Sequence, residues 1–163
     1  MDRPRISIPP DLGDYVVEGI SLILLLLVVY LAGQHWPQLP PRIPVHLNGA
    51  GVVDQWESRN TIWIIPGISL LIYGGFSVLQ RYPHTYNYLK PITRENAYES
   101  YRLAIKLMRF LKMACLLLFL IIQNLIIKLA IEVKPSISLL PVGLGLLFLL
   151  GGIGWYAWKS YRV

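Results

Sequence analysis

Apolar residues in this chain gather into four long runs, separated by shorter stretches that are rich in polar, charged and turn-forming residues. The runs cover about residues 15–33, 62–80, 113–131 and 137–158. A helix needs roughly 20 apolar residues to cross the hydrocarbon core of a bilayer, because each residue adds about 1.5 Å of rise. The pattern therefore predicts an all-α membrane protein with four transmembrane helices, forming a single integral domain over residues 1–163.

The composition agrees with a membrane protein. Charged residues make up 15% of the chain, against about 25% in soluble domains. The first apolar run follows Arg3 and Arg5, as the apolar core of a signal peptide would. However, Gln34–Pro37 stands where a small-residue cleavage site would lie. We therefore expect the first run to be a retained signal anchor.

The distribution of Lys and Arg predicts the orientation, because the cytoplasmic flanks of membrane spans carry an excess of these residues. Eleven of the 15 lie near the termini or between the second and third runs: Arg3, Arg5, Arg81, Lys90, Arg94, Arg102, Lys106, Arg109, Lys112, Lys159 and Arg162. The other four are Arg42, Arg59, Lys128 and Lys134. Both termini are expected to be cytoplasmic, and residues 36–59 to face outward. The lipid bilayer accounts for the basic charge, and no nucleic-acid partner is inferred.

The segment before the third run has the spacing of an amphipathic helix over about residues 93–112, beginning at Thr93. One face holds charged residues at steps of four, three, four and three, namely Glu95, Glu99, Arg102, Lys106 and Arg109. Contact of the basic residues with an anionic leaflet explains such a face. The alternative is a docking surface for a cytoplasmic partner, formed by Glu99, Arg102, Lys106 and Arg109.

A few polar and small residues punctuate the apolar runs. Glu18 lies near the predicted cytoplasmic face, where it can reach interfacial water or pair with the basic residues before the third run. Gln123 and Asn124 lie deeper, and interhelical hydrogen bonding is their expected role. The glycines of the fourth run predict close helix packing within the chain, and a homo-oligomer is the alternative.

The segment from Trp36 to Arg59 is where specific recognition or chemistry is expected. Its prolines exclude helix at the start of the segment. Asn48-Gly49 stands between short apolar stretches and predicts a turn, of which a tight β-hairpin is the simplest outcome. A hairpin would bring His46 and Asp54 into the same region.

Neutral histidine can bind a metal or accept a proton, so His46 is the candidate chemical group of this segment. No H-x-x-x-H, C-x-x-C or H-E-x-x-H spacing is present, so a metal site would need ligands that the fold assembles. A structural hydrogen bond to Asp54, or a recognition surface, are the other interpretations. We expect no cofactor, and a transition metal held by His46 and Asp54 is the alternative.

Residues 39–59 read L-P-P-R-I-P-V-H-L-N-G-A-G-V-V-D-Q-W-E-S-R and resemble the signature of the DUF1648 family of small bacterial membrane proteins. The family pattern has an aromatic residue where this chain has Leu47, and Lys where it has Arg59. With a second similar stretch from Asn87 to Arg102, the resemblance covers about residues 22–112. It implies a bacterial cytoplasmic (inner) membrane location. It also implies motif or ligand-binding roles for Arg42, His46, Asn48, Gly51, Asp54 and Trp56.

The same domain occurs in SdpI-type immunity proteins, which protect a producing cell from a secreted peptide toxin and help to signal its presence. Those proteins continue with further helices beyond this domain. The resemblance therefore implies a non-enzymatic membrane protein that senses or binds an extracytoplasmic peptide or envelope partner. The alternatives are an accessory or assembly subunit of a larger membrane complex, and a small metal-binding membrane enzyme that uses His46 and Asp54.

Overall fold

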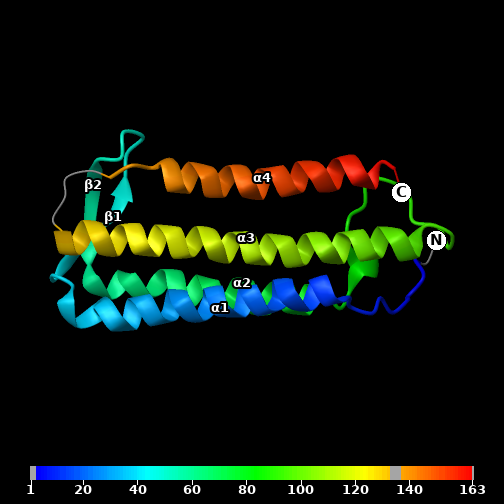
Figure 1. Ribbon diagram of the computed structural model, residues 1–163, viewed down its shortest axis with the longest axis horizontal. Coiled ribbons are helices and arrows are strands. Elements are labelled where there is room, and N and C mark those ends of the chain that lie inside the picture. Colours follow the sequence, from blue (N-terminus) through cyan, green and yellow to red (C-terminus); the bar gives the residue numbers. More distant parts are fainter. Residues whose placement is uncertain (1–2, 133–136, 163) are drawn as a thin grey trace.

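The computed structural model describes residues 3–132 and 137–162, and in it the chain forms four long helices with a small sheet at one end (Figure 1). The helices are α1 (Leu12–His35), α2 (Ile64–Leu79), α3 (Ala97–Glu132) and α4 (Leu140–Ser160). A 3-10 turn, η2 (Arg59–Trp63), extends α2. Among the described residues, these four segments are long and apolar enough to cross a membrane, which confirms the predicted class. Lys134, one of the charges used for the orientation, lies outside the described residues.

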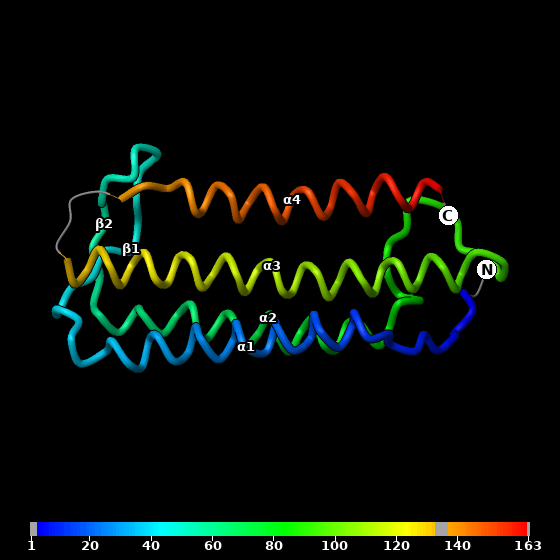
Figure 2. Tube along the Cα trace, in the orientation of Figure 1, coloured from blue at the N-terminus to red at the C-terminus, as the bar shows by residue number. Residues whose placement is uncertain are grey.

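The helix α3 is the centre of the bundle. It packs against α1, α2 and α4, whereas α4 packs mainly on α3. The chain passes back and forth along the long axis, so α1 and α3 run in the same direction (Figure 2). Both chain ends and the α2–α3 connection lie together at one end of the bundle, here called the terminal end. The sheet lies at the opposite end, here called the sheet end.

Local side-chain bonds determine where two of the helices begin. The Asp11 carboxylate accepts a hydrogen bond from the Asp14 N–H (3.0 Å), and the Asp14 carboxylate accepts one from the Asp11 N–H (2.9 Å). This capping box starts α1 at Leu12. The amphipathic segment and the third apolar run form one continuous helix, α3. Thr93 and Asn96 bond each other's N–H groups in the same reciprocal way, and the Ala97 N–H donates to the Thr93 carbonyl, so Thr93 caps the turn that leads into the regular part of α3 at Ala97.

Two clusters of buried side chains hold the bundle together. The cluster at the sheet end joins α1, β1, η2 and α3 through Ala32, Leu39, Ile43, Ile62, Ile127 and Ala130. The second cluster lies between α1 and α3 and contains Leu24, Leu25 and Leu116. Large apolar side chains elsewhere point outward, including Leu71 (76% exposed) and Leu147 (66% exposed). Lipid chains cover such side chains in a spanning bundle.

Two glycines let α4 lie close to α3. A Cβ at Gly152 would collide with the ring of Phe110, and one at Gly145 would lie 3.1 Å from Leu118. At these two positions the structure uses the glycines of the fourth run for packing within the chain.

The sheet consists of β1 (Arg42–Leu47) and β2 (Val53–Ser58), which pair in antiparallel fashion with irregular register around His46. Their connection is longer than a two-residue Asn48-Gly49 turn would be. The Asn48 side-chain oxygen accepts hydrogen bonds from the N–H groups of Ala50 (3.0 Å) and Val52 (3.1 Å). Gly51 takes the left-handed conformation, with φ of 75°. The turn therefore spans residues 48–52.

Candidate functional site

The two strands of the hairpin have different surroundings. On β1, Ile43 is 1% exposed and belongs to the cluster at the sheet end, so this strand is anchored to the helices. Every residue of β2 after Val53 is exposed. The turn is fastened as well, because the Gly51 carbonyl accepts a hydrogen bond from the Ile137 N–H (3.1 Å). The hairpin is therefore anchored to the bundle by β1 and by its turn, and β2 is its exposed strand.

His46 and Asp54 meet across the hairpin. The His46 Nδ1 atom lies 2.6 Å from Asp54 Oδ1, and the two side chains are 61% and 43% exposed. A carboxylate can only accept hydrogen bonds, so the His46 Nδ1 atom carries a hydrogen and donates the hydrogen bond to Asp54. The Nε2 atom of a neutral His46 ring then keeps its lone pair for another partner. A pair this exposed contributes at most about 1 kcal/mol to stability.

Other motif residues make their own contacts along the hairpin. The Arg42 guanidinium donates a hydrogen bond to the Trp56 carbonyl (3.0 Å), and the Trp56 side chain is 40% exposed. Arg59 lies over the ring of Trp36, 5.0 Å from its centroid. The hairpin therefore joins the motif residues in two pairs, Arg42 with Trp56 and His46 with Asp54, while Asn48 and Gly51 shape the turn.

An apolar crevice of about 170 Å³ lies beneath the hairpin. One side of it is β1, including His46 and Leu47, and the other side is formed by α3 and the start of α4. The histidine is thus flanked by an apolar surface on one side and by Asp54 on the other. That combination suits an amphipathic ligand better than a small ion.

The metal hypothesis concerns the same pair. Within residues 3–132 and 137–162, no three His, Cys, Asp or Glu side chains are grouped so that they could hold a metal ion. His46 and Asp54 offer two donors, whereas zinc sites use three or four protein ligands. A metal at this pair would need donors from another molecule, and metal binding stays an untested prediction.

A second polar constellation lies at the terminal end, where ion pairs join α1 to α3. Lys106 Nζ lies 2.5 Å from Asp11 Oδ2. Arg109 Nη1 lies 2.7 Å from Asp14 Oδ1. Lys112 Nζ lies 2.5 Å from Glu18 Oε2, which confirms the predicted pairing of Glu18 with the basic residues before the third run. Because α1 and α3 run in the same direction with similar spacing of these residues, successive pairs stack into a ladder.

The outermost carboxylate of this ladder is strongly stabilised in its charged form. Asp11 accepts a hydrogen bond from Lys106 and another from the Asp14 N–H, and these lower its pKa from 3.8 to about 2. The pair is exposed, so it contributes to the local arrangement of α1 and α3 more than to the core.

Lys112 is the residue whose environment the sequence analysis missed. It was assigned to the cytoplasmic flank, but its side chain is 0% exposed. Its Nζ donates to Glu18 Oε2 and to the Ser77 hydroxyl (2.9 Å), and it lies 4.6 Å from the centroid of the Tyr73 ring. One ammonium group therefore joins α1, α2 and α3. The sequence analysis also did not identify Asp11 and Asp14 as partners of basic residues on α3.

A signal for this ladder is present in the sequence. Asp11, Asp14 and Glu18 are spaced by three and four residues, so they share one face of α1. Their partners on α3, Lys106, Arg109 and Lys112, recur with similar spacing, at steps of three. If both helices enter the membrane from the same side, two such faces can align, and the matched spacing predicts their pairing.

The ladder uses part of the predicted docking surface. Arg102 and Lys106 remain 43% and 37% exposed, but Arg109 is only 13% exposed. Glu99 lines a small cavity together with Arg102, Lys106 and Lys159. The docking role of these α3 residues stays a prediction. Gln123 donates a hydrogen bond to the Ile62 carbonyl (3.3 Å), as expected for a residue that joins helices.

Comparison with known families places the hairpin inside a recognised region. Residues 22–70 match a family model described as a domain of unknown function, DUF1648. This match confirms the predicted resemblance and covers most of α1, the hairpin and the first part of α2. The second similar stretch, residues 87–102, lies outside it. No curated protein matches the chain, and no solved structure matches it.

Proposed function

From the DUF1648 match and the exposure of the hairpin, we propose that this is a non-enzymatic multi-pass protein of the bacterial cytoplasmic membrane. It binds an extracytoplasmic peptide or envelope partner through His46, Asp54 and Trp56, and uses no cofactor. The observation that carries the proposal is the exposure of β2 on a hairpin whose other strand is anchored to the bundle. A recognition surface needs this combination of rigidity and access.

The chemistry of β2 favours an extended ligand. The described sheet has two strands, so one edge of β2 has no neighbouring strand. Free backbone N–H and C=O groups on such an edge can pair with an extended peptide, and side chains along the strand then select among peptides. Trp56 supplies the large aromatic contact that dominates many interfaces. His46 and Asp54 supply a polar pair beside it.

The orientation is part of the proposal. The terminal end carries most of the Lys and Arg residues, which supports a cytoplasmic location for both termini and an outward-facing hairpin. A single helix, α3, reaches from the cluster under the hairpin to the terminal end. We propose that its exposed residues Glu99, Arg102 and Lys106, with Arg109 beside them, form the docking surface for a cytoplasmic partner. Immunity or signalling of the SdpI type would need such a connection.

Peptide selection tests the recognition role. Short linear peptides displayed as a library would be selected against the wild-type protein in lipid nanodiscs. We expect the selected peptides to lose about tenfold or more in affinity for Trp56→Ala, because aromatic anchors carry most interface energy. Glu57→Ala is the matched control, because neighbouring side chains on a strand point to opposite faces and Glu57 is paired with Ile43. Unchanged binding to a folded His46→Ala/Asp54→Ala/Trp56→Ala triple variant would refute the proposal.

Cysteine labelling tests the orientation independently. The chain has one cysteine, so a Cys115→Ser background allows single reporters to be placed. A membrane-impermeant maleimide should label Ala50→Cys, in the exposed turn, on intact cells. It should label Arg94→Cys, in the α2–α3 connection, only after the cells are permeabilised. The reverse pattern would place the hairpin in the cytoplasm and contradict an extracytoplasmic ligand.

One observation favours a second function, that of an accessory or assembly subunit. Within the most apolar 18-residue stretch of α4, only 6% is buried against the rest of the chain. Three of its glycines, Gly143, Gly151 and Gly154, face open space, so another helix could approach closely there. A subunit should copurify with a stoichiometric partner after gentle solubilisation. A homo-oligomer would appear instead as a multiple of the 18.6 kDa chain in native mass spectrometry.

A further inference from the structure

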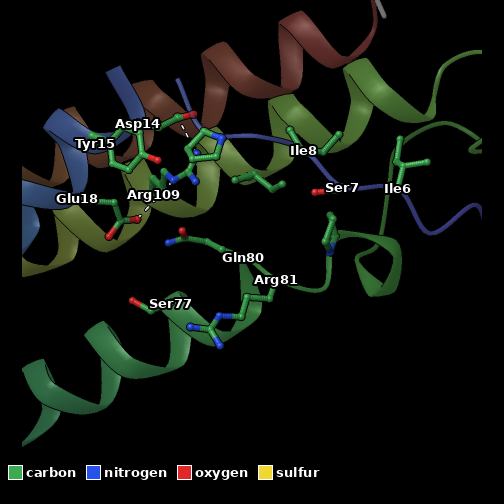
Figure 3. A pocket seen from close by; sticks show the side chains of 13 residues that line it. Ile6, Ser7, Ile8, Asp14, Tyr15, Glu18, Ser77, Gln80, Arg81 and Arg109 are labelled. Carbon is green, nitrogen blue, oxygen red and sulfur yellow. Dashed lines mark ion pairs between the residues drawn. The ribbon is translucent and has the colours of Figure 1, made fainter. Parts of the chain in front are cut away.

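Polar side chains within the apolar helices are mostly bonded inside the chain, but one near the sheet end is not. In a cavity of about 480 Å³ at the terminal end, Arg109 pairs with both carboxylates of the lining, Asp14 and Glu18 (Figure 3). Closer to the sheet end, Gln123 donates a hydrogen bond to η2. Among residues 3–132 and 137–162, the adjacent Asn124 side chain has no hydrogen-bond partner. The hydrogen bond between helices that we expected of Asn124 is thus absent from the described part of the chain.

Asn124 faces a groove of about 360 Å³ between α1 and α3. The groove is otherwise lined by Leu27, Tyr30, Leu31, Leu120 and Ile121. The Tyr30 side chain is 58% exposed, and its hydroxyl has no hydrogen bond with a described residue either. Asn124 lies about two turns before the end of α3, within the apolar part of the helix. Lipid chains offer no hydrogen bonds, so an amide that faces them costs free energy that a polar partner would remove.

The shape of this face is complementary to itself. Beside the groove, α1 presents a ridge of exposed side chains at steps of four, three, four and three, namely Val16, Ile20, Ile23, Leu27 and Tyr30. This spacing lets two helices pack along their length. A two-fold axis along the membrane normal reverses the order of ridge and groove in the second copy. The ridge of each copy then lies opposite the groove of the other.

The polar groups match in the same arrangement. A two-fold axis along the membrane normal keeps every residue at its own depth, so only residues at similar depth can meet. Tyr30 and Asn124 line one groove and therefore lie at similar depth. A phenolic hydroxyl and a side-chain amide can each donate and accept a hydrogen bond. Tyr30 of each copy can thus bond Asn124 of the other, and the symmetry makes this contact twice.

We infer that this face joins two copies of the chain into a parallel dimer. The α1 ridge of each copy packs against the groove of the other, and Tyr30 bonds Asn124 across the contact. A polar residue within an otherwise apolar helix contact fixes the register of the two helices. The hairpin function proposed above does not use this face. The exposed side of α4, considered above for a partner subunit, is a different surface.

Native mass spectrometry of the protein released from detergent micelles tests the dimer. We expect a species of twice the 18.6 kDa chain. Tyr30→Phe and Asn124→Leu should each weaken the dimer about tenfold, through the loss of hydrogen bonds between membrane helices. Each change removes a polar group without a described partner in the chain, so thermal unfolding of the monomer should be unaltered. Tyr15→Phe, which changes another exposed tyrosine of α1, is the matched control and should leave the dimer intact.

Crosslinking in membranes locates the contact. In a Cys115→Ser background, cells express two differently tagged copies, one with Tyr30→Cys and the other with Asn124→Cys. A short, membrane-permeant bifunctional thiol reagent should join the two tags. Leu147 lies on α4 and is 66% exposed. Leu147→Cys in place of Tyr30→Cys should therefore give no product with Asn124→Cys.

Three results would overturn the inference. The first is a monomer at every protein concentration, whether it is free or carries bound lipid or a different protein. The second is an unchanged dimer in both Tyr30→Phe and Asn124→Leu. The third is a crosslink with Leu147→Cys in place of Tyr30→Cys, which would move the contact to α4. Peptide binding by the hairpin is measured separately, so the two proposals fail separately.

Discussion

Replacing Glu18 by Gln should destabilise the bundle more than replacing Lys112 by Met, although both changes remove the same ion pair. Without the negative charge, the fully buried ammonium of Lys112 keeps only uncharged partners: the amide oxygen of the new side chain, the Ser77 hydroxyl at 2.9 Å and the Tyr73 ring at 4.6 Å. Without the ammonium, Glu18 is still 29% exposed and keeps Arg109 at 3.4 Å. Lys112 therefore has no negatively charged partner after Glu18 is changed, whereas Glu18 still has Arg109 after Lys112 is changed.

The expected losses in the free energy of unfolding follow from that difference. Removing one partner of a buried ion pair costs about 3–5 kcal/mol, because the other charge is left uncompensated. We expect Glu18→Gln to approach that range. Lys112→Met removes charged hydrogen bonds but leaves no buried charge without a partner, so its cost should be about 1–3 kcal/mol. The double variant Glu18→Gln/Lys112→Met should be more stable than Glu18→Gln alone, because neither charge is then left unpaired.

Unfolding in mixed micelles, followed by circular dichroism as the denaturing detergent is increased, measures these differences. Lys128→Met is the matched control, because Lys128 is an exposed lysine on the same helix. It should unfold like the wild type. Equal destabilisation by Glu18→Gln and Lys112→Met would refute the reasoning. Additive effects in the double variant would refute it as well, since interacting partners give non-additive changes.

Three further predictions concern the hairpin and the ladder. Gly51→Ala should destabilise by about 1–3 kcal/mol, because φ is 75° and a Cβ would lie 2.3 Å from a backbone carbonyl oxygen; Gly49→Ala, with open space around its Cβ, should be near neutral in the same unfolding assay. Because the pKa of Asp11 is lowered from 3.8 to about 2, its stabilising pair with Lys106 is complete above pH 3.8 and is lost as the pH falls through 2. Asp11→Asn should thus be less stable than wild type at neutral pH and equally stable below pH 2. Mass spectrometry of protein purified without a metal-affinity tag should detect no stoichiometric transition metal, whereas zinc that is lost in His46→Ala would make His46 a ligand.

The helices could be predicted because the bilayer imposes their length. Apolar runs of sufficient length are visible in the sequence whatever the tertiary contacts are, and all four correspond to helices in the structure. Helix ends were less predictable. Asp11 and Asp14 cap each other and start α1 before the apolar run, and the reciprocal bonds of Thr93 and Asn96 form the turn that leads into α3. Such capping bonds are short-range but compete with other local options.

The hairpin segment was recognisable because its information is local. Proline, glycine, histidine and aspartate at short spacing carry the DUF1648 resemblance, and the family match over residues 22–70 confirms it. The sequence did not indicate which strand would be anchored. Ile43 is buried because Ile62 and Ile127 cover it, and both come from distant parts of the chain. The exposure of β2 is a consequence of that packing.

The sequence by itself determined the class of protein, the number of apolar helices and the segment that carries the family motif, because each depends on residues close together in the chain. The tertiary structure decided which charges are paired and which are buried. Lys112 reads as an ordinary flanking lysine until α1 and α2 enclose it. The cavity lined by Asp14, Glu18 and Gln80 likewise exists only where the N-terminal segment, α1, the end of α2 and α3 converge. Electrostatic energies depend on distance and burial in space, and the order of residues along one chain sets neither directly.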